Sequence, residues 1–164
     1  MMKPLILLLS GFIFCSAMLP DPENELEKSM ARGKTLYAGN CISCHMAKGE
    51  GVVETFPPLA KSDYLLKTPL KAIQAIKFGL QGPIQVNGVT YDNMMPEPGL
   101  DEQEVADVMN YILNSWGNSS DKKLITAQMV KEVNPTESVV QKLIPNCTNA
   151  RIIDGHPHCN ARKS

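Results

Sequence analysis

The amino-acid sequence predicts an all-α domain with a small β-hairpin, followed by a C-terminal extension. Apolar residues recur at helical spacing in three separate segments. One short stretch alternates apolar and polar residues around Asn-Gly, which is typical of a tight hairpin. After residue 118 the chain becomes mostly polar, with scattered prolines. We therefore expect a domain over residues 23–118 and an extension over residues 119–164.

Composition restricts the class of protein. The chain has 164 residues, of which 43% are hydrophobic and 20% charged, as in ordinary globular proteins. Aromatic residues make up only 5%, which is a low content for a hydrophobic core. The formal net charge is −1 and no basic stripe is present, so nucleic acid is not an expected partner. Any docking patch for a protein partner must be local.

Residues 1–17 are predicted to form a signal peptide. Lys3 supplies the positive start, residues 5–14 form an apolar stretch too short to span a bilayer comfortably, and small residues precede a cleavage point after Ala17. Two alternatives stay open: lipidation of Cys15, which the bulky residue before it disfavours, and an uncleaved membrane anchor. In each case the body of the protein is exported, and we expect a periplasmic location.

The first helix is expected over residues 23–38. Its apolar face has spacings of four, three and four residues, and it consists of Leu26, Met30, Gly33 and Tyr37. A glycine on that face costs helix stability unless another element packs closely against it. The Gly-Asn pair at residues 39–40 ends the helix.

Directly after this helix comes Cys41-x-x-Cys44-His45, the attachment sequence of a c-type haem. Two thiols three residues apart lie on one turn, where each can add to one vinyl group of a single porphyrin. The imidazole that follows is then placed to bind the iron. A thioredoxin-like dithiol would need a βαβ pattern that is missing here, and a zinc site would need a second pair, whereas the next cysteine is the distant Cys147. We predict one covalently bound haem c.

Three further elements follow a loop over residues 46–61. A helical turn can start at Ser62. Thr68 and Pro69 then mark the start of a helix whose apolar face carries Leu70, Ile73, Ile76 and Leu80, and Gly79 is its expected stop. Residues 84–91 form the hairpin around Asn-Gly.

The last core helix has the strongest start signal, because Asp101 and Glu104 form a capping box. Its expected apolar face consists of Val105, Val108, Met109, Ile112 and Trp116. Gly117-Asn118 is expected to end it.

The extension contains one expected short helix, over residues 126–133. Cys147 and Cys159 are predicted to form a disulfide in an oxidising compartment. Pairing of one of these cysteines with a partner protein and a metal site that uses His156, His158 and Cys159 are the alternatives. The proline between the two histidines disfavours the metal site.

The sixth iron ligand decides the function. Met46 is adjacent to His45 and cannot reach the opposite face of a haem. Met94 and Met95 remain in a proline-bounded loop after elimination of the helical methionines and of the tail histidines. Met95 is preferred, since Pro96 restricts it to an extended conformation. His45 also needs an acceptor for its second ring nitrogen, and residues 56–59 are the expected source.

Together these residues resemble a class I monohaem cytochrome c domain over about residues 26–117, like that of small exported cytochromes and of haem domains attached to dehydrogenases and copper nitrite reductases. The residues that carry the resemblance are Gly33, Tyr37, Cys41, Cys44, His45, Pro57, Leu59, Asn87, Gly88, Tyr91, Met95, Pro96 and the helix end at 114–118.

The resemblance implies the cytochrome c fold, with helices around a covalently bound haem. It implies Met95 as an axial ligand and the Pro57 carbonyl as the acceptor from the proximal histidine. It also implies that the first and last helices cross at Gly33 and Tyr37. Leu59, Tyr91 and Trp116 complete the cofactor-binding set that it implies. The family often has Met-Pro-Pro, whereas this chain has Met-Pro-Glu, which leaves the ligand in place and alters the local charge.

We therefore expect an electron carrier rather than an enzyme, with His45 and Met95 holding the iron. Its partners would be an electron donor and an acceptor, such as a dehydrogenase, reductase or terminal oxidase. The protein could also be the cytochrome subunit of such a complex. The alternative from another class is a haem enzyme or gas sensor in which the sixth ligand is displaceable.

Overall fold

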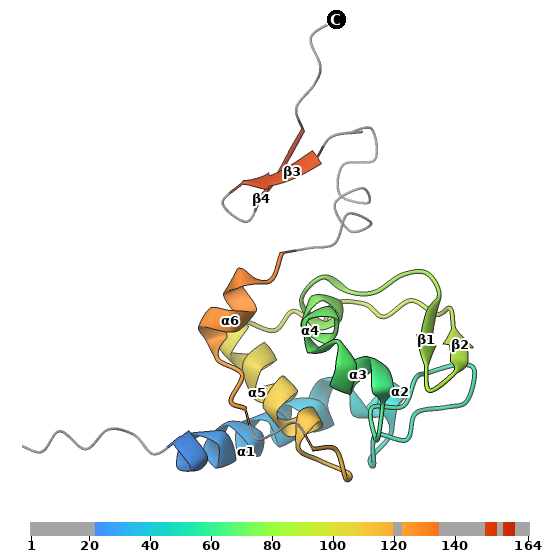
Figure 1. Cartoon of the computed structure of the whole chain (residues 1–164), viewed down its shortest axis with the longest axis vertical. Coiled ribbons are helices and arrows are strands. Elements are labelled where there is room, and N and C mark those ends of the chain that lie inside the picture. Colours follow the sequence, from blue (N-terminus) through green and yellow to red (C-terminus); the bar gives the residue numbers. More distant parts are fainter. Residues whose placement is uncertain (1–21, 120–122, 135–149, 154–155, 160–164) are drawn as a thin grey trace, which may run out of the picture.

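The computed structural model describes residues 22–119, 123–134, 150–153 and 156–159 (Figure 1). The elements are α1 Pro22–Asn40, α2 Ile42–His45, α3 Asp63–Lys67, α4 Pro69–Phe78, β1 Ile84–Val86, β2 Val89–Tyr91, α5 Glu102–Leu113, α6 Ala127–Glu132, β3 Ala150–Ile153 and β4 His156–Cys159. The predicted all-α class with a small hairpin is confirmed. The predicted signal peptide and the side chains of the predicted Cys147–Cys159 disulfide lie outside the described residues.

Helices α1 and α5 pack against each other at Gly33. A Cβ atom at this position would collide with the backbone carbonyl of Asp107 on α5 and would lie 2.9 Å from the Cβ of Tyr111. The predicted close packing at this glycine is therefore confirmed. Next to it, Ser29 donates to the Asp107 carboxylate at 2.6 Å, and Arg32 forms an ion pair with the same group.

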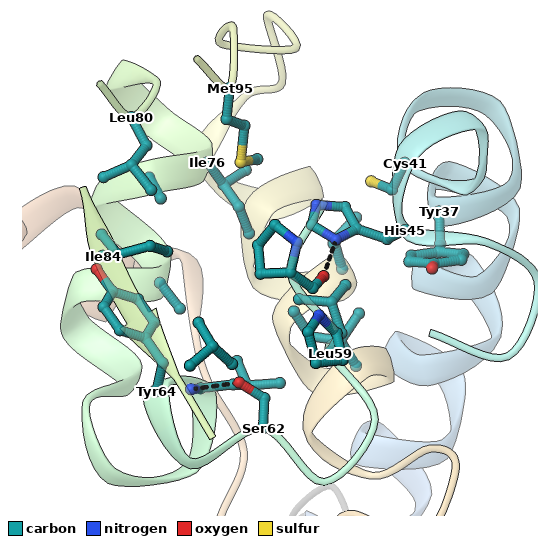
Figure 2. A pocket seen from close by; sticks show the side chains of 18 residues that line it. Tyr37, Cys41, His45, Leu59, Ser62, Tyr64, Ile76, Leu80, Ile84 and Met95 are labelled. Atoms are coloured by element: carbon teal, nitrogen blue, oxygen red, sulfur yellow. Dashed lines mark hydrogen bonds between the residues drawn. The ribbon is translucent and has the colours of Figure 1, made fainter. Parts of the chain in front are cut away.

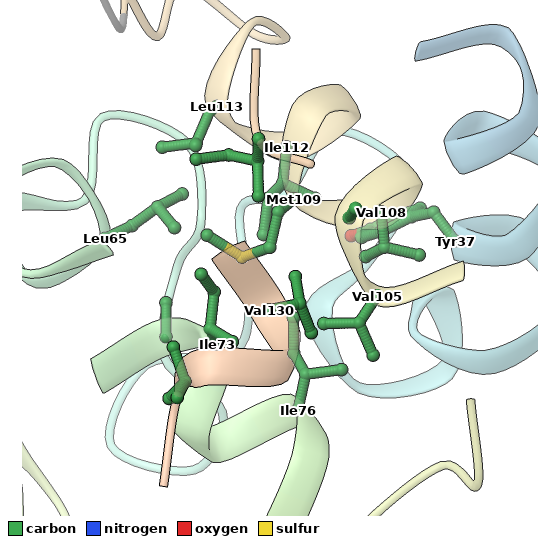
Figure 3. Packing of buried hydrophobic residues seen from close by; sticks show 14 residues of the cluster. Tyr37, Leu65, Ile73, Ile76, Val105, Val108, Met109, Ile112, Leu113 and Val130 are labelled. Atoms are coloured by element: carbon green, nitrogen blue, oxygen red, sulfur yellow. The ribbon is translucent and has the colours of Figure 1, made fainter. Parts of the chain in front are cut away.

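The hydrophobic core lies between α5, α4 and α6 (Figure 3). Met109 on α5 and Ile73 on α4 are completely buried, and so is Val130 on α6. The buried amide of Asn110 also exchanges two hydrogen bonds with the backbone of Ile125, each 2.8 Å long. The division of the chain after residue 118 stays a prediction. The packing favours a boundary after α6, because this helix completes the core.

Helix α5 starts where the sequence predicts and ends earlier. The capping box of Asp101 and Glu104 is present, with both reciprocal hydrogen bonds. The expected continuation to residue 116 is wrong, because the helix stops at Leu113 and Trp116 has a positive φ of 53°. The side chain of Asn118 provides a physical reason: it folds back and donates to the carbonyl of Ile112 at 2.7 Å, which closes the helix end.

The other predicted elements need two corrections. The Thr68 hydroxyl does not cap α4, because it donates to the Tyr64 carbonyl of the preceding helix at 2.6 Å. Leu70 is 59% exposed, so the buried face of α4 is made by alanine and isoleucine side chains instead: Ala72, Ile73, Ala75 and Ile76. Thr126 caps α6 through a bond to the amide of Met129, as the expected short helix requires.

The hairpin of β1 and β2 forms with Ile84 opposite Tyr91 and Val86 opposite Val89. Asn87 and Gly88 both have positive φ, of 52° and 81°, as the predicted type I′ turn requires. Beyond the core, β3 and β4 form a second antiparallel pair that the sequence pattern did not predict.

Candidate functional site

The two thiols of the attachment sequence lie on the single turn α2, directly after α1. The backbone amide of Cys41 donates to the Tyr37 carbonyl at 2.9 Å, so the turn continues from the end of α1. Both Cys41 and Cys44 are free and half-buried. Burial, with a smaller contribution from the neighbouring thiol, raises the pKa of Cys41 to about 11. Both cysteines thus line one pocket region from a single turn.

His45 is the last residue of α2 and is buried, with 8% of its surface exposed. Its Nδ1 lies 2.9 Å from the carbonyl oxygen of Pro57. Because a carbonyl can only accept, Nδ1 must carry the proton, and this leaves Nε2 with a free lone pair. Burial lowers the pKa of His45, although the bond to Pro57 acts in the opposite direction. The imidazole is therefore neutral and oriented as a metal ligand.

The loop that carries Pro57 is fixed from both sides. The hydroxyl of Tyr37 donates to the carbonyl of Met46 at 2.7 Å, which holds the start of the loop. The carbonyl of Gly49 accepts from the amides of Leu59 and Ala60 at 2.7 and 2.8 Å, which closes the loop on itself. Gly49 has no room for a side chain, since a Cβ there would lie 2.6 Å from the ring of Trp116.

An apolar pocket opens in front of His45 (Figure 2). Together with the open solvent at its mouth it encloses about 600 Å³. Its walls come from helices α1 to α5, from strand β1 of the hairpin and from the loops. The lining residues are Tyr37, Cys41, His45, Pro57, Pro58, Leu59, Ser62, Tyr64, Leu65, Ala72, Ala75, Ile76, Leu80, Ile84, Val86, Met95, Val108 and Ile112.

A second part of the pocket shares five of these residues with the first part. The shared residues are His45, Pro57, Leu80, Ile84 and Met95. The second part adds Cys44, Thr55, Phe56, Tyr91, Asn93, Met94 and Pro96. The two parts together form one crevice, with Cys41 in its first part and Cys44 in its second part.

Met95 projects its thioether into this crevice, into which the imidazole of His45 also points (Figure 2). Its backbone is held on both sides by hydrogen bonds with Leu80, of 2.8 and 2.9 Å. Met94 is 62% exposed and lines only the second part of the crevice.

These residues fit a c-type haem. Two thiols, a neutral imidazole with one free nitrogen and a thioether face a crevice whose walls are almost entirely apolar. A flat, mostly apolar porphyrin is the kind of group that such walls and ligands can hold. It would also supply the aromatic bulk that the core of this chain lacks.

The structure brings together seven of the eight residues that the sequence assigns to the site. Leu59 lines the first part and Tyr91 the second part of the crevice. Trp116 lies in neither part and packs against Tyr37, with ring centroids 5.1 Å apart. Trp116 therefore supports a lining residue of the crevice, Tyr37, and does not line the crevice itself.

Sequence reasoning missed several residues of the lining. Ile76 and Leu80 appeared only as members of an apolar helix face, and Ile84 only as part of an alternating strand. Tyr64 lies on a helix of five residues, which is too short for a periodic signal. The pattern of apolar residues shows that such side chains are buried, and only the fold shows that they surround a cavity.

Comparison with known proteins agrees with this geometry. The profile of the cytochrome c family matches residues 30–116. The chain is 32% identical over 127 residues to cytochrome c-552 of Thermus thermophilus, covering 73% of this chain and 85% of that protein.

Two other relatives are subunits of larger enzymes. The cytochrome c subunit of the quinone alcohol dehydrogenase of Gluconobacter oxydans is 35% identical over 91 residues, which is 54% of this chain and 19% of that subunit. The cytochrome c subunit of gluconate 2-dehydrogenase of Pantoea cypripedii is 32% identical over 111 residues, which is 65% of this chain and 25% of that subunit.

Proposed function

Because the chain belongs to the cytochrome c family, which binds haem c covalently, we propose that it is an electron carrier with His45 and Met95 as the two axial ligands. The observation that supports this proposal best is the arrangement of the crevice. The imidazole and the thioether both point into one apolar space, and Cys41 lies at its edge (Figure 2). An iron with both axial positions filled favours electron transfer over the binding of small molecules.

When bound, the haem supplies the one-electron chemistry by alternating between ferric and ferrous iron. The chain would do the rest. Cys41 and Cys44 hold the group covalently, and the Pro57 carbonyl fixes the orientation of His45 through its Nδ1 proton. The apolar walls exclude water, which limits the reorganisation that accompanies a change of charge. The backbone bonds between Leu80 and Met95 hold the thioether in place.

The partners would be redox proteins that exchange one electron with this carrier. Relatives that are cytochrome subunits of dehydrogenases support a dehydrogenase as a donor, with this chain either as its subunit or as a separate acceptor. Cys44 and the exposed Met94 line the same part of the crevice, and the exposure of Met94 makes this side a suitable place for a brief contact.

Export to the periplasm is part of this proposal, and the predicted signal peptide supports it. In the part of the chain that the structure describes, no helix has the length and apolar character needed to cross a membrane. Attachment through the N-terminus therefore stays a separate hypothesis.

The test is the visible spectrum of the holoprotein, matured with covalent haem, in both redox states and with carbon monoxide. We expect low-spin haem whose reduced form does not bind carbon monoxide. Met95→Ala should open the sixth position, which would give high-spin haem and rapid carbon monoxide binding. Met94→Ala is the matched control and should behave as the wild type.

Two other results would change these assignments. If the wild-type reduced protein binds carbon monoxide rapidly, the carrier function is wrong and a haem enzyme or gas sensor takes its place. If only Met94→Ala opens the iron, the assignment of the ligand moves by one residue and electron transfer stands.

A further inference from the structure

The side chain of Asn118 connects the end of α5 to the loop that carries Pro57. Asn118 is buried, with 8% of its surface exposed. Its Nδ2 donates to the carbonyl of Leu59 at 2.9 Å and to that of Ile112 at 2.7 Å. Its Oδ1 accepts from the backbone amide of Lys61 at 2.6 Å. One amide group thus uses both of its donor hydrogens and its oxygen to join two segments more than fifty residues apart.

The loop needs this external support because of its sequence. Pro57 and Pro58 have no amide hydrogen, so neither can anchor the backbone by donating a hydrogen bond. Before them, Phe56 pairs with Val52 within the same loop. The next backbone amide is that of Leu59. The position of the Pro57 carbonyl is therefore determined by the anchors on each side of the two prolines.

The anchors after the prolines are Gly49 and Asn118. Gly49 accepts from the amides of Leu59 and Ala60, but it belongs to the same loop and could move with it. Asn118 belongs to the segment after α5, which lies outside the loop. It holds the carbonyl of Leu59, two residues after the Pro57 carbonyl that His45 uses.

We propose that Asn118 is a positioning residue for the proximal iron ligand. By fixing Leu59 and Lys61 to the end of α5, it holds the Pro57 carbonyl at hydrogen-bond distance from Nδ1 of His45. That bond determines which ring nitrogen faces the iron and makes the imidazole a stronger donor. The proposal rests on the proposed function only in that the chain must carry its haem on His45.

The competing explanation is that Asn118 only closes the end of α5 through Ile112. Both explanations predict a loss of stability when the amide is changed, so stability cannot separate them. The Nδ1 proton of His45 can, because a residue that acts only on the helix end would leave this proton unaffected.

The test variant is Asn118→Asp, studied in the reduced holoprotein by NMR. Aspartate can still accept from Lys61, but it loses both donors and places a carboxylate against the carbonyls of Leu59 and Ile112. We expect the Nδ1 proton of His45 to exchange with solvent faster by up to about tenfold, the factor that corresponds to the loss of one ordinary hydrogen bond. The reduction potential is compared in the neutral variant Asn118→Ser, where it should rise, since a less basic imidazole stabilises ferric iron less. In Asn118→Asp the added negative charge favours ferric iron and opposes this rise.

Asn114→Asp is the matched control. It makes the same chemical change at the same helix end, where the Asn114 amide donates to the carbonyl of Asn110 on its own helix. The exchange rate of the His45 Nδ1 proton should stay as in the wild type. Asn118→Ser, which keeps a smaller neutral donor and acceptor, should give an intermediate effect and replaces the aspartate variant if that variant does not fold.

An unchanged exchange rate in both Asn118 variants, together with an unchanged potential in Asn118→Ser, would refute the proposal and leave Asn118 as a helix cap. Failure of the proposed function is a distinct result. The Nδ1 proton reports only on the proximal side of the haem, so it can be measured whatever occupies the position of Met95.

Discussion

Replacing Gly33 with alanine tests the closest contact in the fold. The methyl group of Gly33→Ala would meet the backbone carbonyl of Asp107 and the Cβ of Tyr111. Neither atom is the movable end of a side chain, so α1 and α5 have to separate. Separation would also lengthen the hydrogen bonds from Ser29 and Arg32 to the carboxylate of Asp107.

The expected change in the free energy of unfolding is the balance of opposing contributions. Alanine favours a helix over glycine by about 1 kcal/mol. Overpacking costs about 1–3 kcal/mol, and weakened bonds to a buried carboxylate cost about 1.5–3 kcal/mol more. We expect the free energy of unfolding to fall by roughly 2–4 kcal/mol, with the haem site intact.

Gly39→Ala is the control on the same helix. No atom lies within 4 Å of a Cβ at that position, so only the gain in helix propensity remains. We expect a stabilisation of roughly 0.5–1 kcal/mol. Both variants can be unfolded as holoproteins in guanidinium chloride, with circular dichroism and the fluorescence of Trp116 as signals. If alanine stabilises the protein at both positions, the close contact between α1 and α5 is refuted.

Two further predictions concern the packing around α5 and α6. Burial would raise the pKa of Asp107, but the hydrogen bonds from Arg32 and neighbouring donors outweigh it and lower this pKa below 3.8. A lowered folded-state pKa gives stability that is present above the unfolded value and lost as the pH falls. Acid titrations of unfolding should therefore be less steep below about pH 4 in Asp107→Asn, and equal slopes would contradict the ion pair. Val130→Ala should cost roughly 2–3 kcal/mol, because Val130 is fully buried, whereas Met129→Ala, at a position 41% exposed, should cost under about 0.5 kcal/mol. Equal small effects in thermal unfolding would place α6 outside the core.

Local sequence patterns predicted much of the fold. The capping box at Asp101 and Glu104 and the Asn87-Gly88 turn depend on interactions between residues close in the chain, so the sequence alone could predict them. The attachment sequence is local for the same reason, since Cys41, Cys44 and His45 lie on one turn.

Predictions failed where another contact competed with the local signal. By its spacing, Trp116 would continue the apolar face of α5. The side chain of Asn118 instead donates to the carbonyl of Ile112, and the helix ends at Leu113. Leu70 has the right spacing for burial on α4, yet it is 59% exposed because alanine and isoleucine side chains make the contact. Asn118 also begins an Asn-x-Ser glycosylation sequon, although its amide is buried and fully hydrogen-bonded.

The sequence by itself determined the cofactor chemistry and the order of the elements as far as α6. A covalent attachment motif, helix caps and a tight turn each depend on residues close together in the chain. They can therefore be predicted without knowledge of the tertiary structure. Only the tertiary structure decided which methionine faces the crevice, that α6 completes the core, and how Asn118 reaches the loop around Pro57. These features depend on contacts between segments distant in sequence, and no local pattern records which segments will meet.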